Sequence, residues 1–96
     1  MARNETLKIG QYEWTQLTNA DITSAVFQVN GAHNVMIAGT VGEVAPTSRK
    51  DGLIFPADSF EGEASRSLAD LFPGISATRL YAKSLNGGSS VFISHA

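Results

Sequence analysis

Two histidines, His33 and His95, are the residues of this sequence best suited to acid–base or metal chemistry. An enzyme or a metal centre needs several such groups held within mutual reach. His33 falls in an expected turn, and His95 is the penultimate residue, a position that is often frayed. No spaced cluster of ligands accompanies either histidine. We therefore expect structural roles for both, with no metal, no cofactor and no enzymatic activity.

Other fragments that resemble catalytic or metal-binding motifs are better explained as turns and solvated loops. Asp-Gly is a common turn pair, and a calcium loop needs alternating carboxylates. The Gly87-Gly88 pair lacks the lysine and the following helix of a phosphate loop. The acidic fragments concerned are Asp51-Gly52, Asp58-Ser59, and Glu61 with Glu63.

Three aromatic residues, Tyr12, Trp14 and Tyr81, would form a platform for a sugar if they were exposed together on a sheet. A small carbohydrate-binding module is therefore one alternative function. A single tryptophan in a small sandwich is more often part of the core. The exposure of these three rings decides between the two.

The composition favours a protein that docks on other proteins. Only 17% of the 96 residues are charged, against about 25% in an average domain, and a weakly charged surface favours association. The net charge of −2 and the scattered basic residues disfavour nucleic acid as a ligand. The chain has no cysteine, which excludes disulfides and thiolate sites. It also has no apolar stretch long enough to span a membrane and no apolar leader, so we expect synthesis in the cytoplasm.

Residues 1–10 are predicted to form a flexible arm, and residues 11–96 a single β-rich domain. The arm has only Leu7 and Ile9 as large apolar side chains, and they lie two residues apart, on the same side of an extended chain. We expect Arg3, Glu5, Leu7, Lys8 and Ile9 to bind a partner protein, with the arm lying along an exposed strand edge. A frayed terminus without a role is the alternative, and the segment 42–62 is the next candidate for the contact.

Runs of β-branched and aromatic residues predict five or six short strands. The Asn30-Gly31 turn predicts a hairpin between the second and third runs, and the turn around Asn86-Gly87-Gly88 predicts another at the C-terminus. Gly39 inside the third run indicates a bulge or a close backbone approach. The expected strands are residues 12–17, 22–29, 35–41, 53–55, 78–83 and 90–94.

One short helix is predicted from about Ser67 to Phe72. Ser67 is a suitable N-cap, with Asp70 three residues later as its capping-box partner. Pro73 disfavours helical geometry at Phe72, and Gly74 allows the chain to reverse. The fold is therefore expected to be mainly β, a small antiparallel sandwich or barrel with one short helix. The expected core is Trp14, Leu17, Ile22, Phe27, Ile37, Phe55, Leu68, Leu71, Phe72, Leu80, Val91 and Ile93.

Five patches of the sequence, taken in order, resemble small virion proteins of tailed bacteriophages that infect alphaproteobacteria. The resemblance covers residues 14–96 and leaves the predicted arm out. None of its motifs is a chemical signature, so it implies no binding residue. The patches are Trp14-Thr15-Gln16-Leu17-Thr18, Ala45-Pro46-Thr47-Ser48, Asp70-Leu71-Phe72-Pro73-Gly74, Arg79-Leu80-Tyr81-Ala82 and Ser94-His95-Ala96.

Proteins of this kind look like capsid decoration or cement proteins, which bind an assembled shell and tie neighbouring capsomers together. The resemblance thus implies a structural virion protein on the capsid surface, with the major capsid protein or another virion protein as partner. It also implies a homo-oligomer, most simply a trimer at local threefold axes. A neck or tail component would share the same sequence features and remains an alternative.

Overall fold

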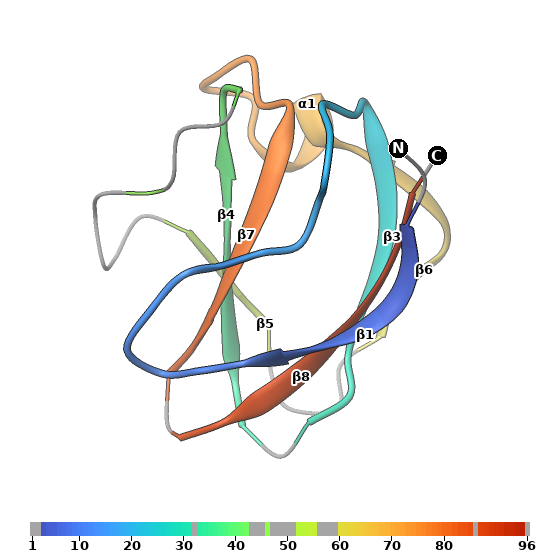
Figure 1. Ribbon diagram of the computed structural model, residues 1–96. Helices are drawn as coiled ribbons and strands as arrows, with labels where there is room; N and C mark the ends of the chain where they lie inside the picture. Colours follow the sequence, from blue (N-terminus) through green and yellow to red (C-terminus); the bar gives the residue numbers. More distant parts are fainter. Residues whose placement is uncertain are drawn as a thin grey trace.

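The computed structural model describes residues 3–31, 33–42, 46, 52–55, 60–85 and 87–95, with only the backbone described for residues 60–66. Strands dominate this part of the chain, which confirms the prediction of a mainly β fold (Figure 1). The elements in chain order are β1 (Arg3–Ile9), β2 (Thr15–Gln16), β3 (Ser24–Val29), β4 (Val35–Thr40), β5 (Leu53–Phe55), β6 (Phe60–Ser67), α1 (Leu68–Leu71), β7 (Arg79–Ser84) and β8 (Ser89–His95).

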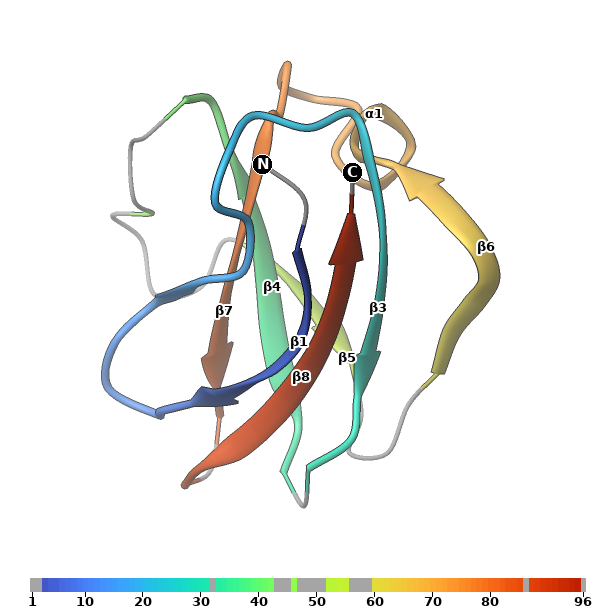
Figure 2. The ribbon, with the colours of Figure 1, turned by 45° about the vertical axis from the view of Figure 1, so that its right-hand side comes forward.

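The strands form two four-stranded antiparallel sheets that face each other as a sandwich. One sheet has the order β1-β8-β3-β6, and the other has the order β2-β7-β4-β5. Figure 2 shows the first sheet in front of the second, with β8 between β1 and β3. We call them sheet A and sheet B.

The strand pairing is that of a jelly roll. The first strand pairs with the eighth, the second with the seventh, the third with the sixth and the fourth with the fifth. Such a pattern arises when one long antiparallel hairpin is wrapped around a common core, so that its strand pairs alternate between two sheets. Most connections therefore cross from one sheet to the other.

Both predicted hairpins are wrong in their pairing, although the turns lie where the sequence indicates. β3 belongs to sheet A and β4 to sheet B, and β7 and β8 are likewise divided between the sheets. Asn30-Gly31 and the turn at Gly87, where φ is +77°, reverse the chain without joining the strands that they connect. A turn signal is local, whereas the choice of partner depends on which faces can be buried.

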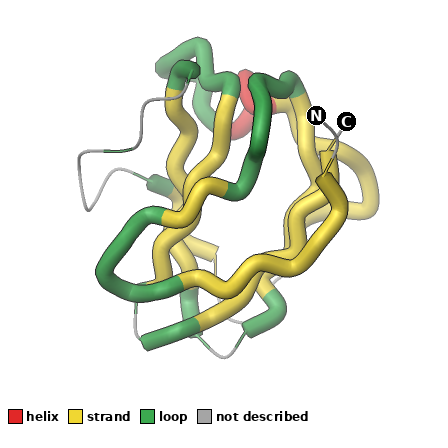
Figure 3. The backbone as a smooth tube through the Cα atoms, in the orientation of Figure 1, coloured by secondary structure: helices red, strands yellow, loops and turns green. Residues whose placement is uncertain are grey.

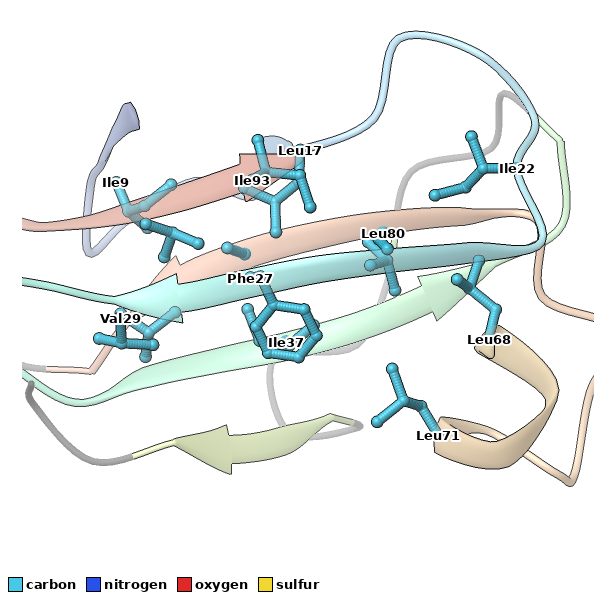
Figure 4. Packing of buried hydrophobic residues seen from close by; sticks show 14 residues of the cluster. Ile9, Leu17, Ile22, Phe27, Val29, Ile37, Leu68, Leu71, Leu80 and Ile93 are labelled. Atoms are coloured by element: carbon cyan, nitrogen blue, oxygen red, sulfur yellow. The ribbon is translucent and has the colours of Figure 1, made fainter. Parts of the chain in front are cut away.

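The core lies between the two sheets (Figure 4). Most predicted core residues are buried there, while Phe55 and Phe72 are half-buried against it and Trp14 stays outside it, half-buried. The buried hydrophobic residues of this cluster are Ile9, Leu17, Ile22, Ala25, Phe27, Val29, Val35, Ile37, Leu68, Leu71, Leu80, Ala82, Val91 and Ile93.

Two segments of the sandwich, one in each sheet, differ from the prediction. The segment containing Glu61 and Glu63 was expected to be a polar loop, but its backbone belongs to β6, at the edge of sheet A. The predicted strand of residues 12–17 is reduced to Thr15 and Gln16. Thr18 extends the contact with β7, because its Oγ1 accepts a hydrogen bond of 3.3 Å from the amide of Leu80.

The helix α1 follows the prediction closely. The Ser67 side chain accepts hydrogen bonds from the amides of Ala69 and Asp70, at 3.1 and 3.3 Å, and so caps the first turn. The helix ends at Leu71, before Pro73. Figure 3 shows it at one end of the sandwich, among the loops that join the strands there. None of the described helical segments has the length and apolar character needed to cross a membrane.

Candidate functional site

The predicted partner-binding residues Arg3, Glu5, Leu7, Lys8 and Ile9 all lie in β1. This strand pairs with β8 along its whole length. The prediction of a flexible arm is therefore wrong for residues 3–9, because their backbone and apolar groups are used inside the fold. Residues 1 and 2 of the predicted arm lie outside the described residues. The β-rich domain accordingly begins before residue 11.

The alternation of side chains in β1 is as predicted, but the surface that receives them belongs to the same chain. Ile9 is 1% exposed and belongs to the core, and Leu7 packs against the core from a half-buried position. Glu5 and Lys8 remain exposed. The two apolar residues that were expected to enter a partner's groove thus stabilise the sandwich itself.

Arg3 connects the edges of the two sheets. Its Nη1 atom donates hydrogen bonds to the carbonyl oxygens of Gln16 and Leu17, at 3.4 and 3.2 Å. These contacts tie β1 of sheet A to β2 of sheet B. One nitrogen of the guanidinium group is therefore used in an intramolecular contact.

The two histidines lie in different parts of the fold, His33 between β3 and β4 and His95 at the end of β8. The backbone carbonyl of His33 accepts a hydrogen bond of 2.9 Å from the Ser89 hydroxyl, and this residue is half-buried beside the turn at Gly87. His95 is buried at the end of β8, so it is not frayed as expected. Among the described residues, no group of three or more metal-binding side chains is found.

The acidic fragments noted in the sequence give no site that the structure describes. Asp51, Asp58 and Ser59 lie outside the described residues, and of Glu61 and Glu63 only the backbone is described. No chemical role is assigned to any of them.

The predicted aromatic platform is not assembled. Tyr12 is 80% exposed in the connection between β1 and β2, whereas Tyr81 is buried in β7 and Trp14 is half-buried before β2. A sugar-binding face needs neighbouring rings that are open to solvent together. Of these three rings, only that of Tyr12 is largely open to solvent, so they do not form such a face.

An apolar groove opens at one end of the sandwich, between α1 with its following turn and the strands β4 and β5. It has a volume of about 540 Å³, within the range of about 300–1,000 Å³ that is usual for ligand pockets. The described side chains that line it are apolar, and three of the described lining residues are glycines. We call it the α1 groove, and it is lined by Gly39, Gly52, Leu53, Leu71, Phe72, Pro73, Gly74 and Ile75.

The packing of α1 on β4 forms the floor of the groove. A Cβ atom added to Gly39 would lie 2.7 Å from the Phe72 ring and 3.0 Å from the Ala77 Cβ. The ring thus rests directly on the backbone of β4, which confirms the close approach predicted at Gly39. Pro73 ends the helix, and the next turn closes with a hydrogen bond of 3.3 Å from the amide of Ile75 to the carbonyl of Phe72. This turn carries Ile75 to the rim.

Two of the exposed large hydrophobic side chains, Leu53 and Ile75, line the α1 groove. Ile54 is 57% exposed, Ile75 46% and Leu53 38%, and Val41, just after β4, is 55% exposed. Tyr12, in a different loop, is the other exposed large hydrophobic residue among those described. Single exposed hydrophobics are ordinary, but a contiguous apolar patch marks an interaction site.

β5 is held in place from one side only. It pairs with β4, and the Phe55 ring meets the Phe27 ring edge to face, with centroids 5.0 Å apart and planes at 84°. The sheet order ends at β5, so no described strand covers its other edge. An open strand edge of this kind can accept an added strand.

The ion pair of this end of the sandwich lies outside the groove lining. Arg79 Nε donates a hydrogen bond of 2.8 Å to Asp21 Oδ1. This hydrogen bond is the main cause, and one with Thr78 the second, of a pKa of the Asp21 carboxyl below its ordinary value. None of the groove-lining residues that the structure describes is charged.

The strand 53–55 and the helix end at Pro73 are both evident in the sequence, but nothing local indicates that they form one site. Leu53 and Ile54 form an apolar run within a polar segment, and Ile75 follows the Pro73-Gly74 turn. The segment 42–62 was the second choice for the contact surface, and β5 lies within it.

Comparisons of the chain with protein-family models, with curated proteins and with solved structures find no match.

Proposed function

We propose that this chain is a structural protein of a tailed-phage particle that binds the outer capsid surface as a decoration or cement protein. The jelly-roll pairing of the strands carries the proposal, since this architecture recurs in viral capsid and lectin domains. The ordered patches of residues 14–96 that resemble small virion proteins support the same role.

The surface of the domain is consistent with docking rather than catalysis. The described residues hold no group of three metal ligands, and the described lining of the α1 groove is apolar. An exposed apolar rim and a low charged fraction are instead suited to a protein–protein contact. The proposed partner is the major capsid protein or another virion protein, and the protein would be made in the host cytoplasm.

A homo-oligomer, most simply a trimer, is part of the proposal. A domain of this length buries a modest share of its surface on folding, so association would add stability. Sedimentation of the purified protein at increasing concentration measures this directly. A strict monomer in solution together with single, isolated copies on the particle would contradict the trimer.

The experiment that tests the function uses particles of the phage that carries the gene, grown with the gene deleted. Purified full-length protein is mixed with these particles, which are then sedimented and imaged by electron microscopy. The proposal predicts saturable binding and added density on the outer shell, grouped around local threefold axes. Density at the neck or tail would favour the alternative structural role. A protein that stays unbound would refute the proposal.

A carbohydrate-binding function is the weaker alternative. The one strongly exposed ring among the three considered is Tyr12, whereas Tyr81 is buried. Binding of immobilised polysaccharide that is lost in Tyr12→Ala would favour this alternative over the capsid role.

A further inference from the structure

We propose that the free edge of β5 and the α1 groove together receive an extended, uncharged peptide segment of the partner protein. The segment pairs with β5 as an added strand and places one large apolar side chain in the groove. This inference rests on the proposed role as a binding protein of a larger particle, and it names the contact through which the chain would bind.

The edge of β5 provides the backbone part of the contact. β5 is the last strand of sheet B and pairs only with β4 among the described strands. An exposed edge presents unpaired N–H and C=O groups, to which a partner strand adds with main-chain hydrogen bonds. Native proteins often protect such edges with charges, but the side chains of this strand are Leu53, Ile54 and Phe55.

The alternation of side chains along β5 connects its edge to the groove. Phe55 faces the core, where it meets Phe27, and Leu53 lies on the same side and lines the groove. Ile54 lies on the opposite face and is exposed. A strand added beside β5 would set one side chain next to Leu53 on the groove side. That side chain would meet the rim formed by Ile75.

The chemistry of the lining selects an uncharged occupant. The lining residues that the structure describes are all apolar or glycine, and a charge placed against them would lose its hydration. At Gly74 an added Cβ atom would meet nothing within 4 Å, so the backbone there is open to close approach. The occupant is therefore an extended segment in which apolar and uncharged polar residues alternate.

The size of the patch argues against a second copy of this domain as the occupant. A stable interface buries about 800 Å² and 20–30 residues on each partner, and that area would be about 15% of the 5291 Å² surface of this chain. The eight described lining residues and Ile54 are far fewer than the 20–30 residues that each side of a stable interface contributes. A short segment of a partner matches the patch better.

Selection from a displayed library of random ten-residue peptides, with the full-length protein as bait, tests the inference. We expect enriched peptides that alternate apolar and uncharged polar residues. The strongest is synthesised, and its affinity is measured for the wild type, Leu53→Asp, Ile75→Asp and the control Val41→Asp. Val41 is exposed to a similar degree but does not line the groove. Binding should weaken at least tenfold in the first two variants and less than twofold in the control.

Ile75→Asp guards against a simple loss of folding, because this residue is exposed in a turn. Thermal melting of every variant checks that the fold is retained. Hydrogen exchange of the β5 amides, with and without the peptide, then tests the added strand. Slower exchange in β5 is expected. Unchanged exchange with a bound peptide would overturn the strand addition.

Other outcomes also overturn the inference. The first is that no peptide is enriched, and the second is that the groove variants bind the peptide as tightly as the wild type. The third is a dimer in solution that Leu53→Asp dissociates, since a second copy of the domain would then be the occupant. Binding of the variants to gene-deleted particles separates the two proposals. If the groove variants decorate the particles like the wild type, the inference fails and the capsid role stands. If the wild type does not decorate them, the capsid role fails.

Discussion

Replacing Ile9 by alanine tests whether β1 belongs to the domain. Ile9 is 1% exposed and lies in the core cluster at the end of β1. The substitution removes three carbon atoms, and at about 0.8 kcal/mol for each buried methylene the transfer term alone is about 2.4 kcal/mol. The cavity left behind raises the expected loss to about 2–5 kcal/mol. A domain of this size has a total stability on the order of 5–15 kcal/mol, so the effect is large.

Urea denaturation and thermal melting measure this loss. A change of 1 kcal/mol shifts the Tm of a domain of this size by about 4–8 °C, so Ile9→Ala should melt about 8 °C or more below the wild type. The matched control is Thr6→Ala, in the same strand but exposed, with an expected change of less than about 0.5 kcal/mol. If both variants melt like the wild type, residues 3–9 contribute nothing to the core. The flexible arm would then be the correct interpretation.

Three further substitutions address the floor of the groove, the helix and the ion pair. Gly39→Ala should lower stability by about 1–3 kcal/mol, because the new Cβ would lie 2.7 Å from the Phe72 ring. The control is Gly74→Ala, whose new Cβ would meet nothing within 4 Å. Equal melting temperatures of the two variants would contradict the close packing at Gly39. Ser67→Ala should cost about 1 kcal/mol through the lost helix cap, and an unchanged urea midpoint would show that the cap has no effect. The pKa of the Asp21 carboxyl is lowered from 3.8. The ion pair with Arg79 therefore stabilises the fold above pH 3.8, and this stabilisation is lost as the pH falls through the lower pKa of the folded state. Asp21→Asn should flatten this part of the stability–pH curve, and a curve of unchanged shape would contradict the assignment.

Short-range features of the fold were predictable from the sequence. Leu53–Phe55 is a strand as expected, and the helix begins after Ser67 and ends before Pro73. These features depend on local physical chemistry, namely β-branched and aromatic side chains, a capping hydroxyl and the fixed φ angle of proline. Gly39 belongs with them, because a glycine within an apolar strand indicates a close approach whatever the neighbour is.

The candidate site was predictable only in pieces. The apolar run at Leu53 and the turn before Ile75 are visible in the sequence, but nothing local indicates that they share one groove. The residues first chosen for binding were those of β1, on the argument that Leu7 and Ile9 could not pack a face of their own. That argument holds for the segment alone. It fails in the folded chain, because β8 supplies the face.

By itself the sequence determined that this protein is mainly β and where most of its turns lie, because these properties follow from each residue and its near neighbours. Only the tertiary structure decided the partners of the strands. β1 pairs with β8 from the other end of the chain, and β3 and β4 separate into different sheets although a turn connects them. The physical reason is that burial of apolar faces depends on which segments meet in space, and wrapping the chain as a jelly roll buries Ile9, Phe27 and Ile37 together.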